Sequence, residues 1–293
     1  MKIFDEFNFI VKNLQEKSVS WKYGILFLFV AVPIILAIIQ YLVVFVIPPQ
    51  FTISYLRLNI TEPAIPTMFI SNYIHDPFTF KHLMGNYLGY VVCFVLNFFM
   101  YFILIPVFKW RNLLYFKYPD SAFFVTAAVF LIALPFSISG ISILFGRMVG
   151  NEATWGFSGI TWAFTAYFLF LFLVVLNDLM MGNFRCYPVP VPDEASQGQS
   201  GISTSGPFQT RVLLLIFFNS FMIIFTIYLV LLDFSDKSIN TFGHLAGFTL
   251  GFLLSSLVLA AMQTHIKKQR ILLAMMCSLL ILIPAVIWIF YPY

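Results

Sequence analysis

The sequence predicts an all-α membrane protein whose chain crosses the bilayer seven times. Hydrophobic residues make up 61% of the chain and charged residues only 10%, whereas a soluble domain normally carries about a quarter charged residues. Seven segments are long and apolar enough to cross a hydrocarbon core about 30 Å thick. The remaining residues are too few for a large soluble domain, so we expect one membrane-embedded domain.

The predicted spans cover residues 24–47, 82–108, 122–145, 157–176, 212–232, 243–262 and 271–291. Ahead of them, residues 1–22 combine lysines with apolar residues at helical spacing. This pattern favours a cytoplasmic amphipathic segment on the membrane surface, and a loosely ordered tail is the alternative. The transmembrane domain then covers residues 23–293. Within it, residues 182–210 are rich in Pro, Gly and Ser, which is typical of a flexible cytoplasmic loop.

The distribution of Lys and Arg predicts that the N-terminus is cytoplasmic, because cytoplasmic connections retain basic residues. The basic residues of the second, fourth and sixth connections are Lys109, Arg111, Lys117, Arg185, Arg211, Lys267, Lys268 and Arg270. The alternate connections hold fewer, so they and the C-terminus are expected outside. The net charge of +4 is small. A charge this small indicates that the basic residues set the membrane topology and do not form a nucleic-acid surface. The expected partner is the lipid bilayer, and the expected location is the plasma membrane.

The first external connection, residues 48–81, is too long for a simple connector. It contains a glycosylation sequon that begins at Asn59. Three cysteines, Cys93, Cys186 and Cys277, show no pairing pattern, so the sequence gives no sign of a disulfide framework or a zinc site.

Three polar clusters occupy the external ends of the even-numbered spans. His82 and Asn86 open the second span at a spacing that puts both on one helix face. Ser158 opens the fourth span within Gly156-Phe157-Ser158-Gly159, and His244 opens the sixth. Each cluster alone is weak, because a Gly-x-Ser-Gly segment in an apolar protein usually reflects helix packing. Together they place a nucleophile, an imidazole and hydrogen-bond donors at one depth.

This combination predicts serine-type chemistry. A serine hydroxyl needs a base to take its proton, and His244 is the histidine placed to do so for Ser158. Attack on a peptide carbonyl builds negative charge on oxygen, for which the helix start at Ser158 and the side chains of Asn86 and His82 offer donors. Because no Asp or Glu lies near His244 in sequence, we predict a Ser–His dyad.

Small residues indicate how the two halves of the dyad meet. Gly243, Gly247 and Gly251 repeat every four residues along the sixth span. Such a stripe allows a close approach of another helix, here the fourth span, which would bring His244 to Ser158.

The ordered set His82-x-x-x-Asn86, Gly156-x-Ser158-Gly159 and His244-x-x-Gly247-x-x-x-Gly251 resembles the rhomboid intramembrane serine proteases. The run Ile74-His75-Asp76-Pro77 ahead of the second span also resembles this family, and the likeness covers residues 68–262. It implies a six-helix catalytic bundle that opens to the external side, with the seventh span as an added C-terminal helix. It further implies Ser158 as nucleophile, His244 as base, and Asn86, His82 and the Ser158 amide as the oxyanion hole. The implied substrates are transmembrane proteins, with no metal or organic cofactor.

The sequence departs from the family pattern at two points. The family commonly has a Tyr that stacks on the catalytic histidine, and Trp162 stands in that place here. Many members also have a Trp-Arg pair in the first external connection. The pair in this chain, Trp110-Arg111, falls on the cytoplasmic side, so we expect residues 48–81 to fold differently.

Two other functions compete with proteolysis. A catalytically silent rhomboid-like protein that binds or escorts transmembrane clients typically loses the serine or the histidine, and this chain keeps both. A transporter would need ionisable residues near the middle of the bilayer. The predicted spans hold almost none there, which argues against proton-linked or ion-linked transport.

Overall fold

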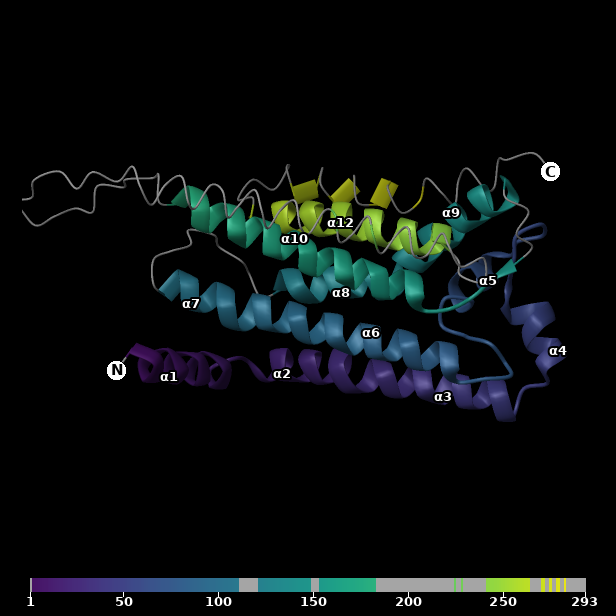
Figure 1. Ribbon diagram of the computed structural model, residues 1–293, viewed down its shortest axis with the longest axis horizontal. Coiled ribbons are helices and arrows are strands. Elements are labelled where there is room, and N and C mark those ends of the chain that lie inside the picture. The colour runs from purple at the N-terminus through teal and green to yellow at the C-terminus, as the bar shows by residue number, and fades with distance from the viewer. Residues whose placement is uncertain are drawn as a thin grey trace, which may run out of the picture.

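The structure is a computed structural model. It describes residues 2–110, 121–148, 153–182 and 241–263, together with single helical residues at 224, 228, 270, 271, 274, 275, 278, 279 and 282. The described part is helical apart from short connections and one pair of two-residue strands. Figure 1 shows the long helices side by side along the long axis of the molecule.

The long helical segments follow one another as α1 (Lys2–Gln15), α2 (Val19–Leu26), the π-helical η1 (Phe27–Ala31), α3 (Val32–Phe45), α6 (Lys81–Phe98), the π-helical η3 (Phe99–Leu104), α7 (Ile105–Trp110), α8 (Ser121–Ile132), α9 (Leu134–Met148), α10 (Ser158–Gly182) and α12 (Thr241–Gln263). Within residues 1–22, Lys2–Gln15 form the helix α1, which packs against α7. Its location on a membrane surface stays a prediction.

Five of the seven predicted spans correspond to helices of the described residues. Among the described residues, four helices are long and apolar enough to cross a membrane, and they cover Val19–Phe45, Lys81–Val107, Ser158–Asn177 and Thr241–Ala261. The helices α8 and α9 add a fifth if the pair, bent by 44°, is one span. The spans predicted at residues 212–232 and 271–291 lie outside the described stretches, so the number of seven and the orientation stay predictions.

Prolines explain where the first three spans change their helical register. Pro33, Pro106 and Pro135 each stand at the second residue of a new helical segment. A proline lacks the N–H that continues the backbone ladder, and its ring crowds the preceding turn. The π-helical segments η1 and η3 directly precede the first two prolines, and the bend between α8 and α9 precedes the third.

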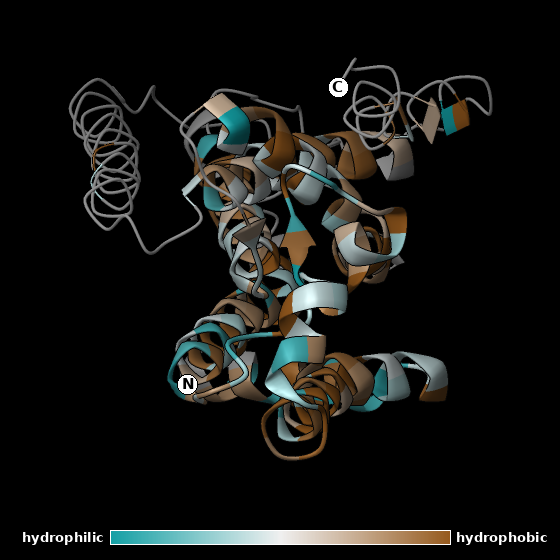
Figure 2. Cartoon of the chain, turned by 90° about the vertical axis from the view of Figure 1, so that its right-hand side faces the viewer, coloured by the Kyte–Doolittle hydropathy of each residue, from teal (hydrophilic) through white to brown (hydrophobic). Residues whose placement is uncertain are grey.

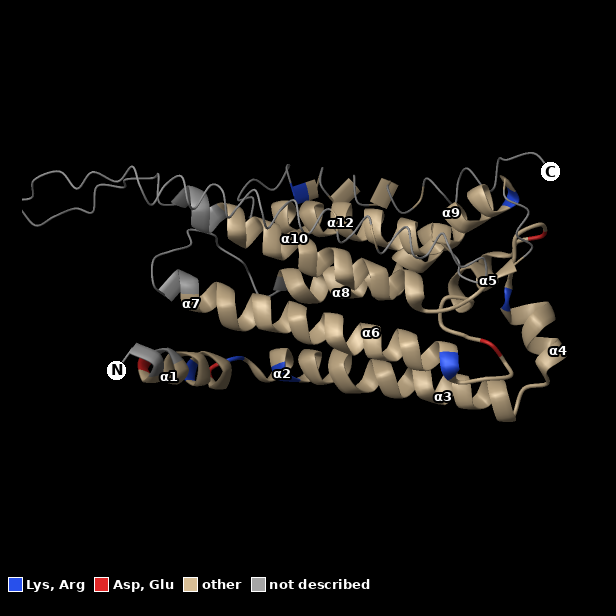
Figure 3. Cartoon of the chain, viewed as in Figure 1, with Lys and Arg blue, Asp and Glu red and all other residues tan. Residues whose placement is uncertain are grey.

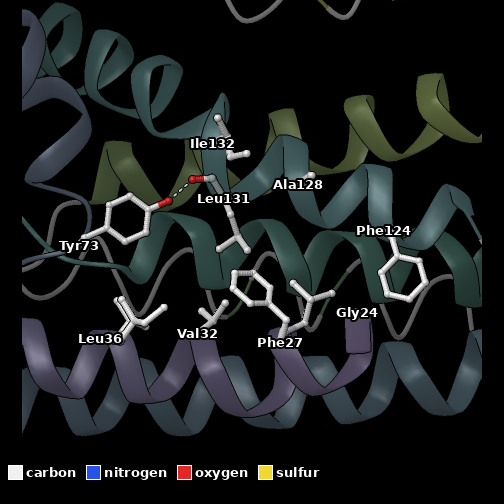
Figure 4. A pocket seen from close by; sticks show the side chains of 11 residues that line it. Gly24, Phe27, Val32, Leu36, Tyr73, Phe124, Ala128, Leu131 and Ile132 are labelled. Atoms are coloured by element: carbon white, nitrogen blue, oxygen red, sulfur yellow. Dashed lines mark hydrogen bonds between the residues drawn. The ribbon is translucent and has the colours of Figure 1, made fainter. Parts of the chain in front are cut away.

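Two tyrosines donate to the carbonyl groups that these prolines leave without a backbone donor. In a regular α-helix the residue at position 135 would donate to the Leu131 carbonyl, but Pro135 has no N–H. The Tyr73 hydroxyl donates to that carbonyl instead (Figure 4). In the π-helical register of η1, the Val32 N–H bonds to the Phe27 carbonyl, five residues back. The next residue, Pro33, has no N–H for the Leu28 carbonyl, and the Tyr90 hydroxyl donates to it at 2.8 Å. An unpaired carbonyl within a bilayer is costly, so these bonds stabilise both spans. Figure 4 also shows that Tyr73 and Leu131 line an apolar pocket of about 320 Å³ between the first and third spans.

The inside of the bundle is aromatic, and its outside is also apolar. Phe102, Phe123 and Phe164 are among the largest fully buried side chains. On the outward faces, Ile38 is 54% exposed and Leu88 is 64% exposed. Figure 2 shows hydrophobic residues on outer surfaces of the helices as well as between them. Such an exterior suits the hydrocarbon of a bilayer, where no water is available to solvate polar groups.

The long connection between α3 and α6 is folded, and we call the end of the bundle that carries it the loop end. It contains α4 (Pro49–Phe51), the π-helical η2 (Thr52–Leu56), β1 (Leu58–Asn59) and α5 (Ile65–Ile70). Strand β1 pairs in antiparallel fashion with β2 (Ala153–Thr154), which lies just before α10. The connection is therefore attached to the segment that leads to Ser158.

The arginines at the loop end have partners within it. Figure 3 marks the few charged residues at this end of the bundle. The Arg57 guanidinium lies 5.5 Å from the centre of the Trp155 ring, and Arg147 donates to the carbonyl oxygens of Ile60 at 3.0 Å and Thr61 at 3.2 Å. A Trp–Arg contact is thus present in space although the two residues are far apart in sequence.

Candidate active site

The helices α10 and α12 are packed directly against each other through glycines. A Cβ atom on Gly247 of α12 would overlap the carbonyl oxygen of Gly159 in α10. One turn further along, a Cβ on Gly251 would lie 2.6 Å from the Cα of Ala163. No side chain fits between the two backbones at these points. The predicted close approach of the two spans is therefore confirmed.

Ser158 and His244 lie at the beginnings of these two helices. Ser158 is the first residue of α10 and is 7% exposed, while the half-buried His244 lies in the first turn of α12. A Cβ on Gly159, which follows Ser158, would lie 3.0 Å from the carbonyl oxygen of Gly243, which precedes His244. The chain neighbours of the predicted nucleophile and base thus meet at one helix crossing.

The imidazole of His244 lies beside an aromatic residue of α10. The Trp162 ring of α10 lies with its centre 5.8 Å from that of His244, and the two planes are inclined by 33°. The indole therefore lies against the histidine, as expected for a residue one turn after Ser158. His82 of α6 lies at the same end of the bundle, beside Gly156 and the segment before Ser158. Side chains of α6, α10 and α12 are therefore gathered at the start of α10.

His82 and Asn86 lie beside the segment that leads into α10. From the position of a Cβ atom on Gly156, the Nε2 atom of His82 is 3.5 Å away and the Nδ2 atom of Asn86 is 3.7 Å away. Gly156 has a φ of +114°, a backbone conformation that side-chain-bearing residues rarely adopt. Glycine is required here by the sharp turn into the helix, and the turn brings both side chains next to the backbone before Ser158.

The start of α10 adds backbone donors to the same place. The N–H of Thr161 is the first in the helix to bond back, at 3.1 Å to the carbonyl of Phe157. The preceding N–H groups of the first turn, including that of Ser158, have no helical partner, and the helix dipole is positive at this end. Backbone and side-chain donors together make this end of α10 suited to a developing negative charge.

The structure adds one histidine to which the motif gave no role. His75 precedes α6 and is fully buried. Its Nε2 atom lies 2.9 Å from the Nδ2 atom of Asn86 and accepts the N–H of Phe157 at 3.3 Å. The imidazole ring centre is 5.5 Å from that of His82. The direct partner of Asn86 is therefore His75, which sequence spacing could not reveal because the loop between them is irregular.

Hydrogen bonds from outside the site hold the loop that carries His75. Gln40, fully buried in the first span, donates to the carbonyl oxygens of Asp76 at 2.8 Å and Thr79 at 3.2 Å. The N–H of Gly156 donates to the carbonyl of Ser71 at 2.8 Å. The loop before α6 is thus tied to both the first span and the segment before Ser158.

Two buried amides within the predicted spans were not among the predicted site residues, because only ionisable residues were considered at those depths. Gln40 is one of them, and Asn97 is the other. Asn97 donates from α6 to the carbonyl of Phe164 in α10 at 2.9 Å. A neutral amide within an apolar span is also costly to bury, and this is the signal that could have found both residues.

Among the residues that the structure describes, no group of three His, Cys, Asp or Glu side chains is arranged as metal ligands. No protein-family model matches the sequence, and the comparisons with curated proteins and with solved structures also found no match.

Proposed function

We propose that this protein is an intramembrane serine endopeptidase of the rhomboid type. It cleaves transmembrane helices of membrane-protein substrates near the external face, with Ser158 and His244 as its dyad and the plasma membrane as its location. The observation that carries this proposal is the packing of Gly247 on Gly159, which holds the start of α12 against the start of α10.

The proposed reaction begins when Ser158 attacks the scissile carbonyl and His244 takes the hydroxyl proton. The oxyanion that forms is stabilised by the N–H groups at the start of α10 and by the side chains of Asn86 and His82. His244 then gives its proton to the leaving amine, and an acyl-enzyme remains on Ser158. A water molecule hydrolyses that ester, with His244 as base again.

Trp162 has a supporting role in this scheme. Its ring lies against His244, so it limits the orientations that the imidazole can adopt. With Trp162 in this position, no carboxylate is needed to orient the base, so Ser158 and His244 act as a dyad rather than as part of a triad.

The experiment that tests the proposal incubates the purified protein, and the Ser158→Ala variant, with a single-span substrate in detergent. The wild type should cleave the substrate and react with a fluorophosphonate, which requires an activated serine. The variant should do neither. A wild type that binds the substrate without cleavage or labelling would favour a silent, client-binding protein instead.

A further inference from the structure

His75 is a buried imidazole that the proposed reaction does not use. It comes from the loop between α5 and α6, and its side chain is fully buried beside Asn86 and the backbone of Phe157. Within the described part of the chain, its Nδ1 atom has no hydrogen-bond partner. Burial of such a group costs free energy, so its presence calls for a compensating role.

The partners of His75 fix its protonation state. The backbone N–H of Phe157 can only donate, so the Nε2 atom that receives it carries a lone pair rather than a proton. The proton of the neutral ring must then be on Nδ1. Burial, together with the neighbouring His82, lowers the pKa of His75 to about 3. The ring therefore stays neutral at physiological pH.

This state of the ring decides which end of the Asn86 amide faces His75. Of the two ends of the Asn86 amide, only the NH₂ group can donate to Nε2, and its nitrogen lies 2.9 Å from that atom. A reversed amide would place its oxygen against the same lone pair, which is repulsive. One N–H of Asn86 is thus anchored, and the second N–H of the same nitrogen is held beside Gly156 and the segment before Ser158.

The geometry points to His75 as the positioning residue of the oxyanion hole: it sets the amide of Asn86 so that a donor, and not an acceptor, faces the developing oxyanion. This role rests on the proposed serine protease function. His75 does not touch the substrate in this scheme, and it acts through Asn86. A flipped amide would direct its oxygen at a negative charge and would raise the barrier instead of lowering it.

A second consequence concerns the backbone before Ser158. The N–H of Phe157 is held by His75 and the N–H of Gly156 is held by the carbonyl of Ser71. Two successive amides are therefore bound to one loop. The bond from Gly156 to Ser71 and the first helical bond of α10, from the Thr161 N–H to the Phe157 carbonyl, do not involve His75, so we expect this backbone to keep its course when the imidazole is replaced.

The test measures kcat and KM of the purified full-length protein on a single-span substrate. In His75→Leu, which removes the acceptor, we expect kcat to fall by about a hundred- to a thousand-fold with KM nearly unchanged, as for the loss of one oxyanion donor. In His75→Gln, whose oxygen reaches the position of Nε2, kcat should recover to within several-fold of wild type. His75→Asn carries the same amide one methylene shorter and should behave as His75→Leu does.

The double variant separates positioning from general damage. Because His75 acts through Asn86, His75→Leu should lower kcat no further when Asn86→Ala is already present. Asn97→Leu is the matched control: it removes a buried amide that also joins α6 to α10, and it should lower thermal stability while kcat is unchanged.

The outcomes distinguish the two proposals. A wild type that neither cleaves nor reacts with fluorophosphonate overturns the proposed function and the role of His75 with it. If the wild type is active, two results overturn the role of His75 alone. One is a kcat that His75→Leu leaves unchanged, and the other is a double variant in which the losses of kcat from His75→Leu and Asn86→Ala multiply. If His75→Leu does not fold, equal activity of the Gln and Asn variants overturns it.

Discussion

Gly247 of α12 lies directly on the Gly159 peptide of α10, with no space for even one additional carbon atom between them. Lipid provides no hydrophobic force that pulls helices together, so close van der Waals contact decides their packing. The separation of the two helix starts therefore depends on this contact.

Replacement of Gly247 with valine should abolish the proposed cleavage without removing any reactive group. The new methyl groups would push α12 away from α10, and a misplacement of about 1 Å can reduce a rate a hundredfold. Cleavage and fluorophosphonate labelling should be lost together. Ala260 lies on an exposed position of the same helix, so Ala260→Val is the control and should retain activity. Full activity in Gly247→Val would show that the glycine contact does not set the dyad.

Ser158→Ala and His244→Ala should each abolish cleavage while the protein remains folded. A dyad acts as a unit, so the double variant should be no worse than either single variant. Initial rates on a single-span substrate, together with melting curves in detergent, measure both effects. Substantial cleavage by Ser158→Ala would contradict the mechanism.

Tyr73→Phe should destabilise the protein because the Leu131 carbonyl loses its donor. The expected cost is about 1 to 2 kcal/mol of unfolding free energy. Pro135→Ala restores the backbone N–H that the Leu131 carbonyl would accept in a regular helix. Tyr73→Phe should therefore lower the unfolding free energy by less in the Pro135→Ala background. Unfolding in mixed detergent measures all three variants. The exposed Tyr55→Phe is the control, and equal costs in both backgrounds would disprove the pairing.

Acid should destabilise the fold through His75. Its pKa is about 3 in the folded protein and about 6.5 in an unfolded chain. Between these values the unfolded state binds a proton that the folded state does not. Stability is therefore lost as the pH falls below about 6.5, by at most about 1.4 kcal/mol per pH unit from this group. Melting temperatures at pH 7.5 and 5 should differ less in His75→Gln than in wild type, and an unchanged difference would contradict this.

Cysteine labelling tests the predicted orientation. In a variant without Cys93, Cys186 and Cys277, a membrane-impermeant maleimide added outside should label a cysteine at position 59 and spare one at position 268. The reason is the excess of basic residues on the cytoplasmic side. Labelling of position 268 from outside would invert the topology and place Ser158 on the opposite face.

From the sequence alone, long apolar segments predicted the membrane-spanning helices, and polar residues at their ends predicted Ser158, His244, His82 and Asn86 as candidate site residues. Apolar segments of sufficient length predicted the four long apolar helices and the bent pair α8 and α9 that the structure describes, because hydrophobic length is a local property. The glycine stripe from Gly243 to Gly251 likewise predicted the contact between the fourth and sixth spans, because spacing along one helix fixes which residues share a face.

Only the tertiary structure decided the contacts made by irregular segments. The pairing of His75 with Asn86, of Arg57 with Trp155 and of β1 with β2 joins parts of the chain that follow no helical period. The same holds for Tyr73, whose partner is defined by a proline in another span. Sequence periodicity describes the faces of single helices, whereas the path of a loop depends on which buried polar groups in other segments remain to be paired.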